Sequence, residues 1–131
     1  MTKQIFKFIL LLTFILIIPS IVSAQESVFK NSTPEERAHF QTEWMKSELS
    51  IDSIIVPVVY NINLKYSMKT QSVMNSNGSR IQKYRHFKDS SDAKDDELKK
   101  IFNKEQYKLY IQKKEQMKQK MKQMIQEKRK K

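Results

Sequence analysis

The side chains that most clearly could bind a ligand in this chain are three methionines near its C-terminal end. Met117, Met121 and Met124 recur at spacings of four and three residues, so a helix would place their thioethers on one face. Thioethers are soft ligands that suit Cu(I), which makes a copper site one interpretation. Methionine also fills irregular cores and adaptable binding surfaces, and we favour packing or contact with a bound polypeptide. We therefore predict no metal site.

The two histidines give no sign of a catalytic or zinc site. His39 and His86 lie far apart in the sequence, and no pattern of carboxylates surrounds either of them. The chain has one glycine and no cysteine, so it has neither a glycine-rich phosphate loop nor a thiol nucleophile. We therefore expect a protein without enzymatic activity, zinc or another cofactor.

Polar residues suited to capping mark the starts of two helices. Thr33 and Glu36 match a capping box, in which the hydroxyl and the carboxylate each accept a hydrogen bond from the other residue's backbone N–H. The helix predicted from here runs to about Glu48. Asn103 and Gln106 match a second box at the start of the last segment, with asparagine as the capping residue.

Residues 51–74, which follow the first helix, are ambiguous. Residues 54–60 are rich in β-branched side chains, which favours a strand. Pro57 argues against a central strand because proline has no N–H to donate to a neighbouring strand. The alternative is a helix capped by Asp52, which would gather apolar side chains on one face at spacings of three and four.

The second half of the chain predicts two more helices. Residues 75–79 are a polar break, and we expect Gly78 to end a helix there as a left-handed C-cap, with a helical hairpin around it. Residues 80–102 form the third segment, in which polar residues 89–92 predict a kink or a restart. The helix that begins after Asn103 would span about 40 Å. That exceeds what a compact core needs, so its end should project or fray.

The last helix carries the candidate surface for contact with a bound polypeptide. Its apolar side chains recur at roughly heptad spacing and are interleaved with lysines. Lysines would attract a partner over a distance, and tyrosine and methionine would supply adaptable contacts. The candidate residues are Tyr107, Tyr110, Met117, Met121, Met124, Lys114 and Lys118.

Positive charge is concentrated at the C-terminal end. The whole chain carries a net charge of +11, and residues 104–131 contain eleven Lys or Arg against three Glu, a net +8. A block of one sign indicates a solvated helix face, an anionic membrane surface or an acidic polypeptide partner. Arg129 is the only arginine in this block, and bidentate contacts to phosphates and bases need guanidinium groups. The block is therefore poorly suited to recognising nucleic acid.

The N-terminus predicts export. Lys3 and Lys7 precede an apolar run of 11 residues, 8–18, and small residues lead up to Ala24. A membrane-spanning helix needs about 20 apolar residues, so this run predicts a cleavable signal peptide. We expect cleavage after Ala24 and a periplasmic location.

Export completes the predicted domain organisation. An exported protein does not meet cytoplasmic nucleic acid, so we predict no nucleic-acid partner. The mature chain is short and without cysteine, so its core is limited and we expect a homodimer. The predicted order is a signal peptide at residues 1–24, a flexible N-terminus at 25–32, a helical domain at 33–126 and a basic tail at 127–131.

A family resemblance enters at the second capping box. The Phe-Asn-Lys-Glu-Gln sequence at residues 102–106 resembles the LTxxQ motif of the Spy/CpxP family of small helical periplasmic proteins. Asn103 stands in the place of threonine, and Gln106 is kept. The family carries two such motifs, and the first should lie near residues 51–55, where Ile55 replaces the glutamine, so this copy is degraded. The resemblance, closest in style to Bacteroidetes-type members, covers residues 33–126.

The resemblance implies an all-α, elongated and curved four-helix domain made of helical hairpins, and a dimer. It favours a helix over a strand at residues 51–74. It also implies an ATP-independent chaperone or envelope stress-response protein, whose basic and partly apolar concave face holds unfolded clients. Two alternatives stay open: an interaction protein that binds one dedicated partner or an anionic membrane surface, and a copper or zinc stress-response protein.

Overall fold

The computed structural model describes residues 31–128 and residue 130. Within this part of the chain there are four α-helices and no strand, so the all-α prediction is confirmed. The predicted signal peptide and most of the predicted flexible N-terminus lie outside the described residues. The helices are α3, Pro34–Leu49; α4, Val56–Asn75; α5, Arg80–Ile101; and α6, Lys104–Lys128.

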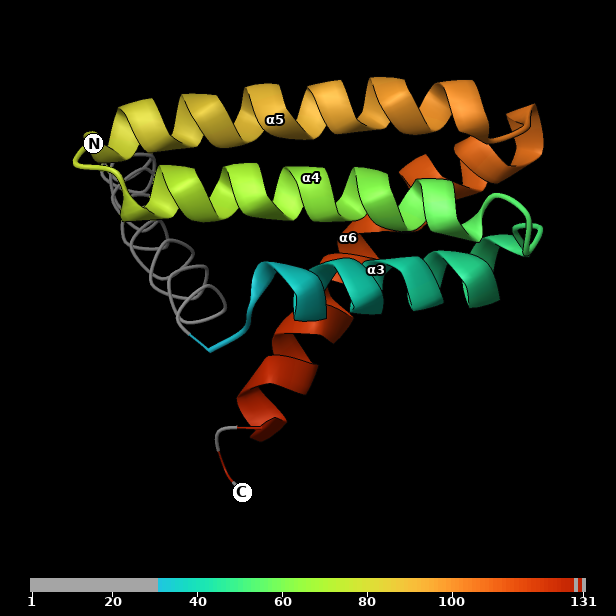
Figure 1. The fold of residues 1–131 in the computed structure, drawn as a ribbon, viewed down its shortest axis with the longest axis horizontal. Helices are drawn as coiled ribbons and strands as arrows, with labels where there is room; N and C mark the ends of the chain where they lie inside the picture. The colour runs from blue at the N-terminus through green and yellow to red at the C-terminus, as the bar shows by residue number, and fades with distance from the viewer. Residues whose placement is uncertain (1–30, 129, 131) are drawn as a thin grey trace, which may run out of the picture.

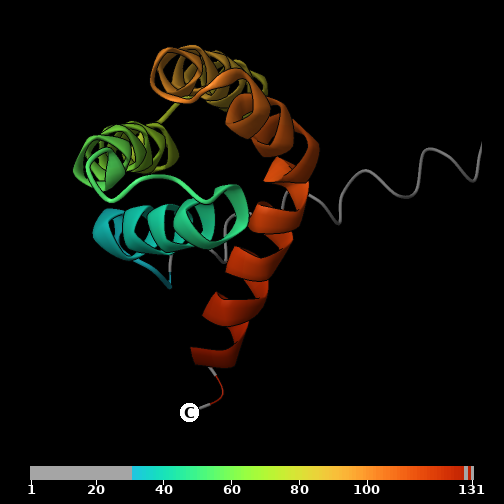
Figure 2. The ribbon, with the colours of Figure 1, turned by 90° about the vertical axis from the view of Figure 1, so that its right-hand side faces the viewer.

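The four helices form a curved arrangement in which α4 packs between α3 and α5 (Figures 1 and 2). The axes of α3, α4 and α5 are nearly parallel lines, with α4 antiparallel to both neighbours, and α6 crosses them steeply while packing on α3 and on α5. Helices α3 and α4 form one helical hairpin, and α4 and α5 form a second. Helix α6 packs across the two hairpins. The structure contains one chain, so the homodimer stays a prediction.

The core lies where the end of α3 meets the beginning of α4 and where α5 turns into α6. Apolar side chains from all four helices are buried there, and the chain connections at Ile51 and Phe102 add one side chain each. The buried cluster consists of Trp44, Met45, Leu49, Ile51, Val59, Ile62, Tyr66, Leu98, Phe102, Tyr110 and Met117.

Buried polar contacts set the position of α3 against α4. Arg37, which is 2% exposed, donates from Nη2 to Oε1 of Gln71 at 2.9 Å. Asn63, also buried, donates from Nδ2 to Oγ1 of Thr42 at 2.9 Å. Buried polar groups are costly without a partner, so these bonds specify how the two helices align.

Both predicted capping boxes are confirmed. Oγ1 of Thr33 accepts from the N–H of Glu36 at 3.1 Å, and Glu36 accepts from the N–H of Thr33 at 3.0 Å. Oδ1 of Asn103 accepts from the N–H of Gln106 at 2.9 Å, and Gln106 accepts from the N–H of Asn103 at 3.1 Å. Each box satisfies two backbone groups that the first turn of a helix leaves without a partner.

The prediction of Asp52 as the cap of the second helix is wrong. That helix, α4, begins at Val56 with Ile55 as its N-cap. Oδ1 of Asp52 instead accepts from the N–H of Ile54 at 3.0 Å and closes a turn just before the helix. The reason is Pro57, which has no N–H and is tolerated only where a helix does not need that donor, in its first turn.

Two expectations for the hairpin between α4 and α5 also need correction. Gly78 has no left-handed conformation. Helix α4 ends at Asn75, and its C-cap Ser76 has an extended backbone and a hydroxyl that donates to the carbonyl of Val73 at 2.7 Å. A third capping box, formed by Ser79 and Gln82, starts α5. This helix then runs unbroken through residues 89–92, because none of those residues removes a backbone donor.

Candidate functional site

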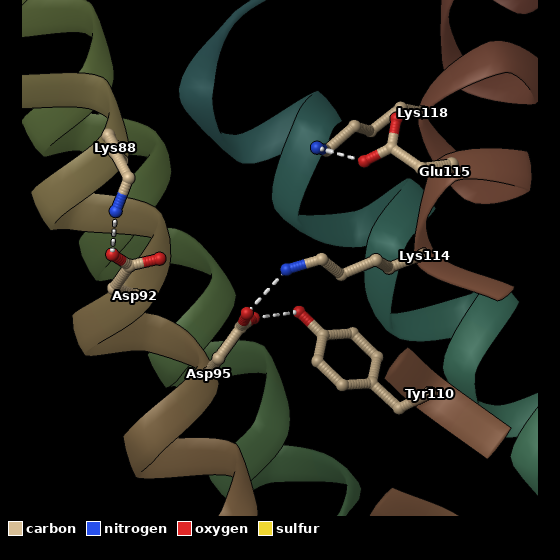
Figure 3. Close-up of polar contacts among 7 residues, drawn as sticks. All are labelled: Lys88, Asp92, Asp95, Tyr110, Lys114, Glu115 and Lys118. Atoms are coloured by element: carbon tan, nitrogen blue, oxygen red, sulfur yellow. Dashed lines mark hydrogen bonds and ion pairs between the residues drawn. The ribbon is translucent and has the colours of Figure 1, made fainter. Parts of the chain in front are cut away.

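Helices α5 and α6 diverge from the turn that joins them, and polar side chains face one another across the angle between them. Figure 3 shows Tyr110 and Lys114 of α6 reaching Asp95 on α5, with Lys118 farther along α6. We call this set the α5–α6 face. It consists of Lys88, Asp92 and Asp95 on α5 and of Tyr110, Lys114 and Lys118 on α6.

Asp95 holds the closed end of the α5–α6 face. It accepts from the hydroxyl of Tyr110 at 2.7 Å and pairs with Nζ of Lys114 at 2.5 Å (Figure 3). Burial raises the pKa of Tyr110 well above its usual value, and the charge of Asp95 raises it further. The phenol therefore stays protonated and acts as a donor, which fixes the angle between the two helices.

At the open end of the α5–α6 face the pairs are local and exposed. Lys88 pairs with Asp92 one turn along α5 at 2.8 Å, and Lys118 pairs with Glu115 one turn back along α6 at 2.6 Å (Figure 3). Exposed pairs of this kind contribute little stability. The open end is therefore a charged surface that no strong contact closes.

Lysines of α6 pair with carboxylates of α3. Lys113 pairs with Glu48 at 2.7 Å and Lys128 pairs with Glu36 at 2.7 Å. The hydrogen bond from Lys113 lowers the pKa of Glu48 below its usual value, and the bond from Lys128 does the same for Glu36. Part of the basic block predicted to be a solvated face is thus engaged within the fold.

The first half of α5 is a basic and apolar surface that the sequence analysis did not single out. Ile81 and Tyr84 are 67% and 68% exposed, and Leu98 is the only buried residue of this 22-residue helix. We call residues 80–88 the basic–apolar half of α5. A signal was present in the sequence: residues 53–88 contain six Lys or Arg and no Asp or Glu, and five acidic residues follow between Asp89 and Glu97.

Lys94 occupies a position between three helices. It is partly buried, and its ammonium donates to Oε1 of Gln41 on α3. Burial lowers the pKa of Lys94 to about 7; the charge of Asp95 opposes this shift, and the charges of Lys114 and Lys118 add to it. A lysine with this pKa changes between its charged and neutral forms near neutral pH.

A comparison with protein families assigns the chain to one of them. A family model described as a domain of unknown function, DUF4890, matches residues 23–110, which is more than half of the chain. The chain belongs to the DUF4890 family. The matched region of this DUF4890 protein includes α3, α4, α5 and the first two turns of α6. No curated protein and no solved structure matches the chain, and the resemblance to the Spy/CpxP family stays a prediction.

The structure buries part of the predicted contact surface of this DUF4890 protein and leaves the rest at least partly exposed. Tyr110 and Met117, which are 2% and 4% exposed, belong to the core, so their assignment to a contact surface is wrong. They are buried because α6 crosses α3 and the end of α5 just where these side chains lie. The remaining predicted residues are partly buried or exposed: Tyr107, Lys114, Met121, Met124 and Lys118.

The methionine stripe has a structural role. Met117 packs in the core, and the sulfur of Met121 accepts a weak hydrogen bond from Nε2 of Gln41 at 3.9 Å. Within residues 31–128 no group of three or more His, Asp or Glu side chains is placed to hold a metal ion. The same part of the chain has no helix with the length and apolar character needed to cross a bilayer.

The glutamine of the LTxxQ-like motif also has a structural role. Besides closing its capping box, Gln106 donates from Nε2 to the carbonyl of Ser50 at 3.4 Å. Ser50 ends α3 in a left-handed conformation, with φ of 49°. The motif thereby connects the start of α6 to the end of α3.

Proposed function

We propose that this DUF4890 protein is an ATP-independent, chaperone-like protein of the bacterial cell envelope that binds unfolded polypeptides. The observation that supports the proposal most is the basic–apolar half of α5. Ile81 and Tyr84 stand there more than 60% exposed, in a helix that buries one side chain. Large apolar side chains gathered on a surface and bordered by charge are typical of interaction sites.

The chemistry of this surface suits unfolded polypeptides. Arg80, Arg85 and Lys88 lie within four positions of Ile81 or Tyr84 in the sequence, and residues 80–88 contain no Asp or Glu. An unfolded chain exposes apolar groups that Ile81 and Tyr84 can contact, while the cations attract its acidic groups over a distance. Tyrosine combines apolar area with a polar tip, which favours contact with many sequences.

The proposed location in the envelope is supported by the N-terminal sequence pattern alone. A lysine-flanked apolar run followed by small residues is typical of exported proteins. A chaperone in that compartment has no ATP to use, which agrees with a mechanism of transient binding and release.

The test is suppression of aggregation by the protein expressed from its full coding sequence. We expect near-stoichiometric suppression, without ATP, for several unrelated unfolding clients. Replacing Ile81 and Tyr84 with serine should remove most of it. Ile111→Ser is the matched control, since this side chain is 41% exposed on α6, away from the proposed surface. Absence of suppression by the wild type with every client would contradict the proposal.

A second candidate is binding to an anionic membrane surface, favoured by the net charge of +8 over residues 104–131. Such binding would show as pelleting with anionic but not neutral vesicles, and it would weaken steeply with salt. Vesicle binding without suppression of aggregation would favour this candidate over the chaperone.

A further inference from the structure

The second half of α6 is attached to one neighbouring helix. In the described part of the chain, the hydrogen bonds and ion pairs that residues 116–128 make with other helices all go to α3. Figure 2 shows the last turns of α6 lying away from α4 and α5. Met117 and Ile125 are the only buried side chains of this segment, which we call the α6 strap. A segment with so few buried contacts belongs to the part of a fold that opens locally.

The ion pairs that hold the α6 strap are exposed or long. Lys128 pairs with Glu36 at 2.7 Å, but their side chains are 52% and 41% exposed. Lys120 reaches Glu48 at 3.9 Å, close to the limit of an ion pair. Exposed pairs contribute little stability, and salt screens them. The electrostatic part of the attachment is therefore weak.

Beneath the α6 strap, α3 has an aromatic side chain between polar ones. Gln41 donates to the sulfur of Met121 at 3.9 Å, and Glu48 pairs with two lysines of α6. Trp44 lies three positions after Gln41 and four before Glu48, so helical spacing places it on the same face. Trp44 is 6% exposed, and its Nε1 has no hydrogen-bond partner among the described residues. A buried donor without an acceptor is costly, so the strap is an imperfect ligand for this face.

We propose that this face of α3 is a docking site for a lysine-rich amphipathic helix of another polypeptide, and that the α6 strap occupies the site in the free protein. The docking site consists of Glu36, Gln41, Trp44 and Glu48. It lies on α3 and not on the basic–apolar half of α5, so it is independent of the proposed function.

The α6 strap shows which chemistry the docking site accepts. Its lysines pair with the carboxylates at both ends of the site, and its methionines recur between them at helical spacing. Glu36 and Glu48 lie about 18 Å apart along the axis of α3, so a partner helix needs lysines separated by a similar distance. A partner that also brings an acceptor to Nε1 of Trp44 makes a contact that the strap lacks, which favours its displacement.

The α6 strap competes with any partner because it is part of the same chain. A tethered competitor acts at a high effective concentration. The apparent affinity for a partner is therefore reduced to the extent that the strap covers the site. Weakening the strap while leaving α3 unchanged should tighten the binding of the partner.

The experiment uses a labelled peptide with the sequence of residues 113–128 as the partner. The loosened variant, Lys120→Gln with Lys128→Gln, should bind it about threefold more tightly than wild type, as the loss of two exposed pairs predicts. Lys100→Gln with Lys104→Gln is the control of equal net charge, because both lysines are exposed and lie outside the strap. Its affinity for the peptide should equal that of wild type.

A further pair of variants identifies where the peptide binds. Adding Glu36→Gln and Glu48→Gln to the loosened variant should cancel the gain in affinity, because the carboxylates of the docking site are then lost. Adding Asp89→Asn and Asp96→Asn, two exposed positions on α5, removes the same charge and should leave the gain in place.

A second measurement needs no substitution, because Trp44 is the only tryptophan of the chain. In wild type, quenching of its fluorescence by neutral acrylamide should increase from low to high salt, while the circular dichroism signal stays helical. Quenching that does not change with salt, or equal peptide affinities of the loosened variant and its lysine control, would overturn the docking site. A dimer formed by the loosened variant alone would identify α6 of a second copy as the occupant and overturn a separate polypeptide.

Discussion

The two halves of α5 belong to the same helix but differ in what they contact. Its second half reaches α4 through Glu97, which accepts from Tyr66 at 2.8 Å, reaches α6 through Asp95, and buries Leu98 in the core. The basic–apolar half, residues 80–88, buries no side chain, and its Lys83 donates to the carbonyl of Met74 at 2.9 Å. One half secures the fold, so the other half can carry an exposed binding surface at little cost to stability.

The prediction with the largest expected change in the free energy of unfolding replaces one apolar side chain in each half of α5. Leu98→Ala should lower the free energy of unfolding by about 2–5 kcal/mol, because Leu98 is fully buried and its loss leaves a cavity. Tyr84→Ala should change it by about 0.5 kcal/mol or less, because Tyr84 is 68% exposed. Urea unfolding of both variants measures the difference, and equal losses would break the comparison.

Two aspartates give a second, smaller contrast along the same helix. Asp95→Ala should cost about 1–3 kcal/mol, since it leaves the buried hydroxyl of Tyr110 without its acceptor. Asp92→Ala is the matched control: the side chains of Asp92 and Lys88 are 59% and 63% exposed, and their pair should be worth about 0–0.5 kcal/mol. A loss at Asp92 as large as that at Asp95 would contradict the assigned roles.

Lys94 predicts how stability changes with pH. Its pKa is lowered from 10.5 to about 7 by burial, so between these values the unfolded chain binds the proton and the folded chain has released it. The free energy of unfolding should therefore rise with pH from about 7 upward, in contrast to the loss expected for groups whose pKa is raised. Thermal unfolding at pH 7 and pH 9.5 measures this rise.

Lys94→Met provides the control for that titration. The variant should show a smaller gain in melting temperature between the two pH values than wild type, since its remaining lysines titrate equally in both proteins. An identical gain would mean that Lys94 keeps an ordinary pKa in the folded chain.

The smallest expected effect concerns the junction that Gln106 supports. Ser50 has φ of 49°, a conformation that costs serine more than glycine. Ser50→Gly should raise the free energy of unfolding by up to about 1 kcal/mol while keeping the carbonyl that Gln106 contacts. Chemical denaturation would detect this, and a clear loss would show that the serine side chain matters more than its backbone.

Features that depend on near neighbours were predictable. The capping boxes at Thr33 and Asn103 need only the residue three positions on, so the starts of α3 and α6 followed from the sequence. The start of α4 was also local in origin, but the capping potential of Asp52 was weighted above the missing N–H of Pro57. The stripe on α6 was identified correctly as a helical face, but not which of its members would be buried.

The sequence by itself determined two helix starts and the uneven distribution of charge, because hydrogen bonds within a turn and net charge depend on local composition. It left residues 51–74 open between a strand and a helix, and only the family resemblance favoured the all-α class. The tertiary structure decided that Met117 belongs to the core and that Ile81 and Tyr84 remain exposed. It also placed Lys94 beside Gln41, which lies 53 positions away in sequence. Burial and pKa depend on which distant helices meet, and no local pattern encodes that crossing.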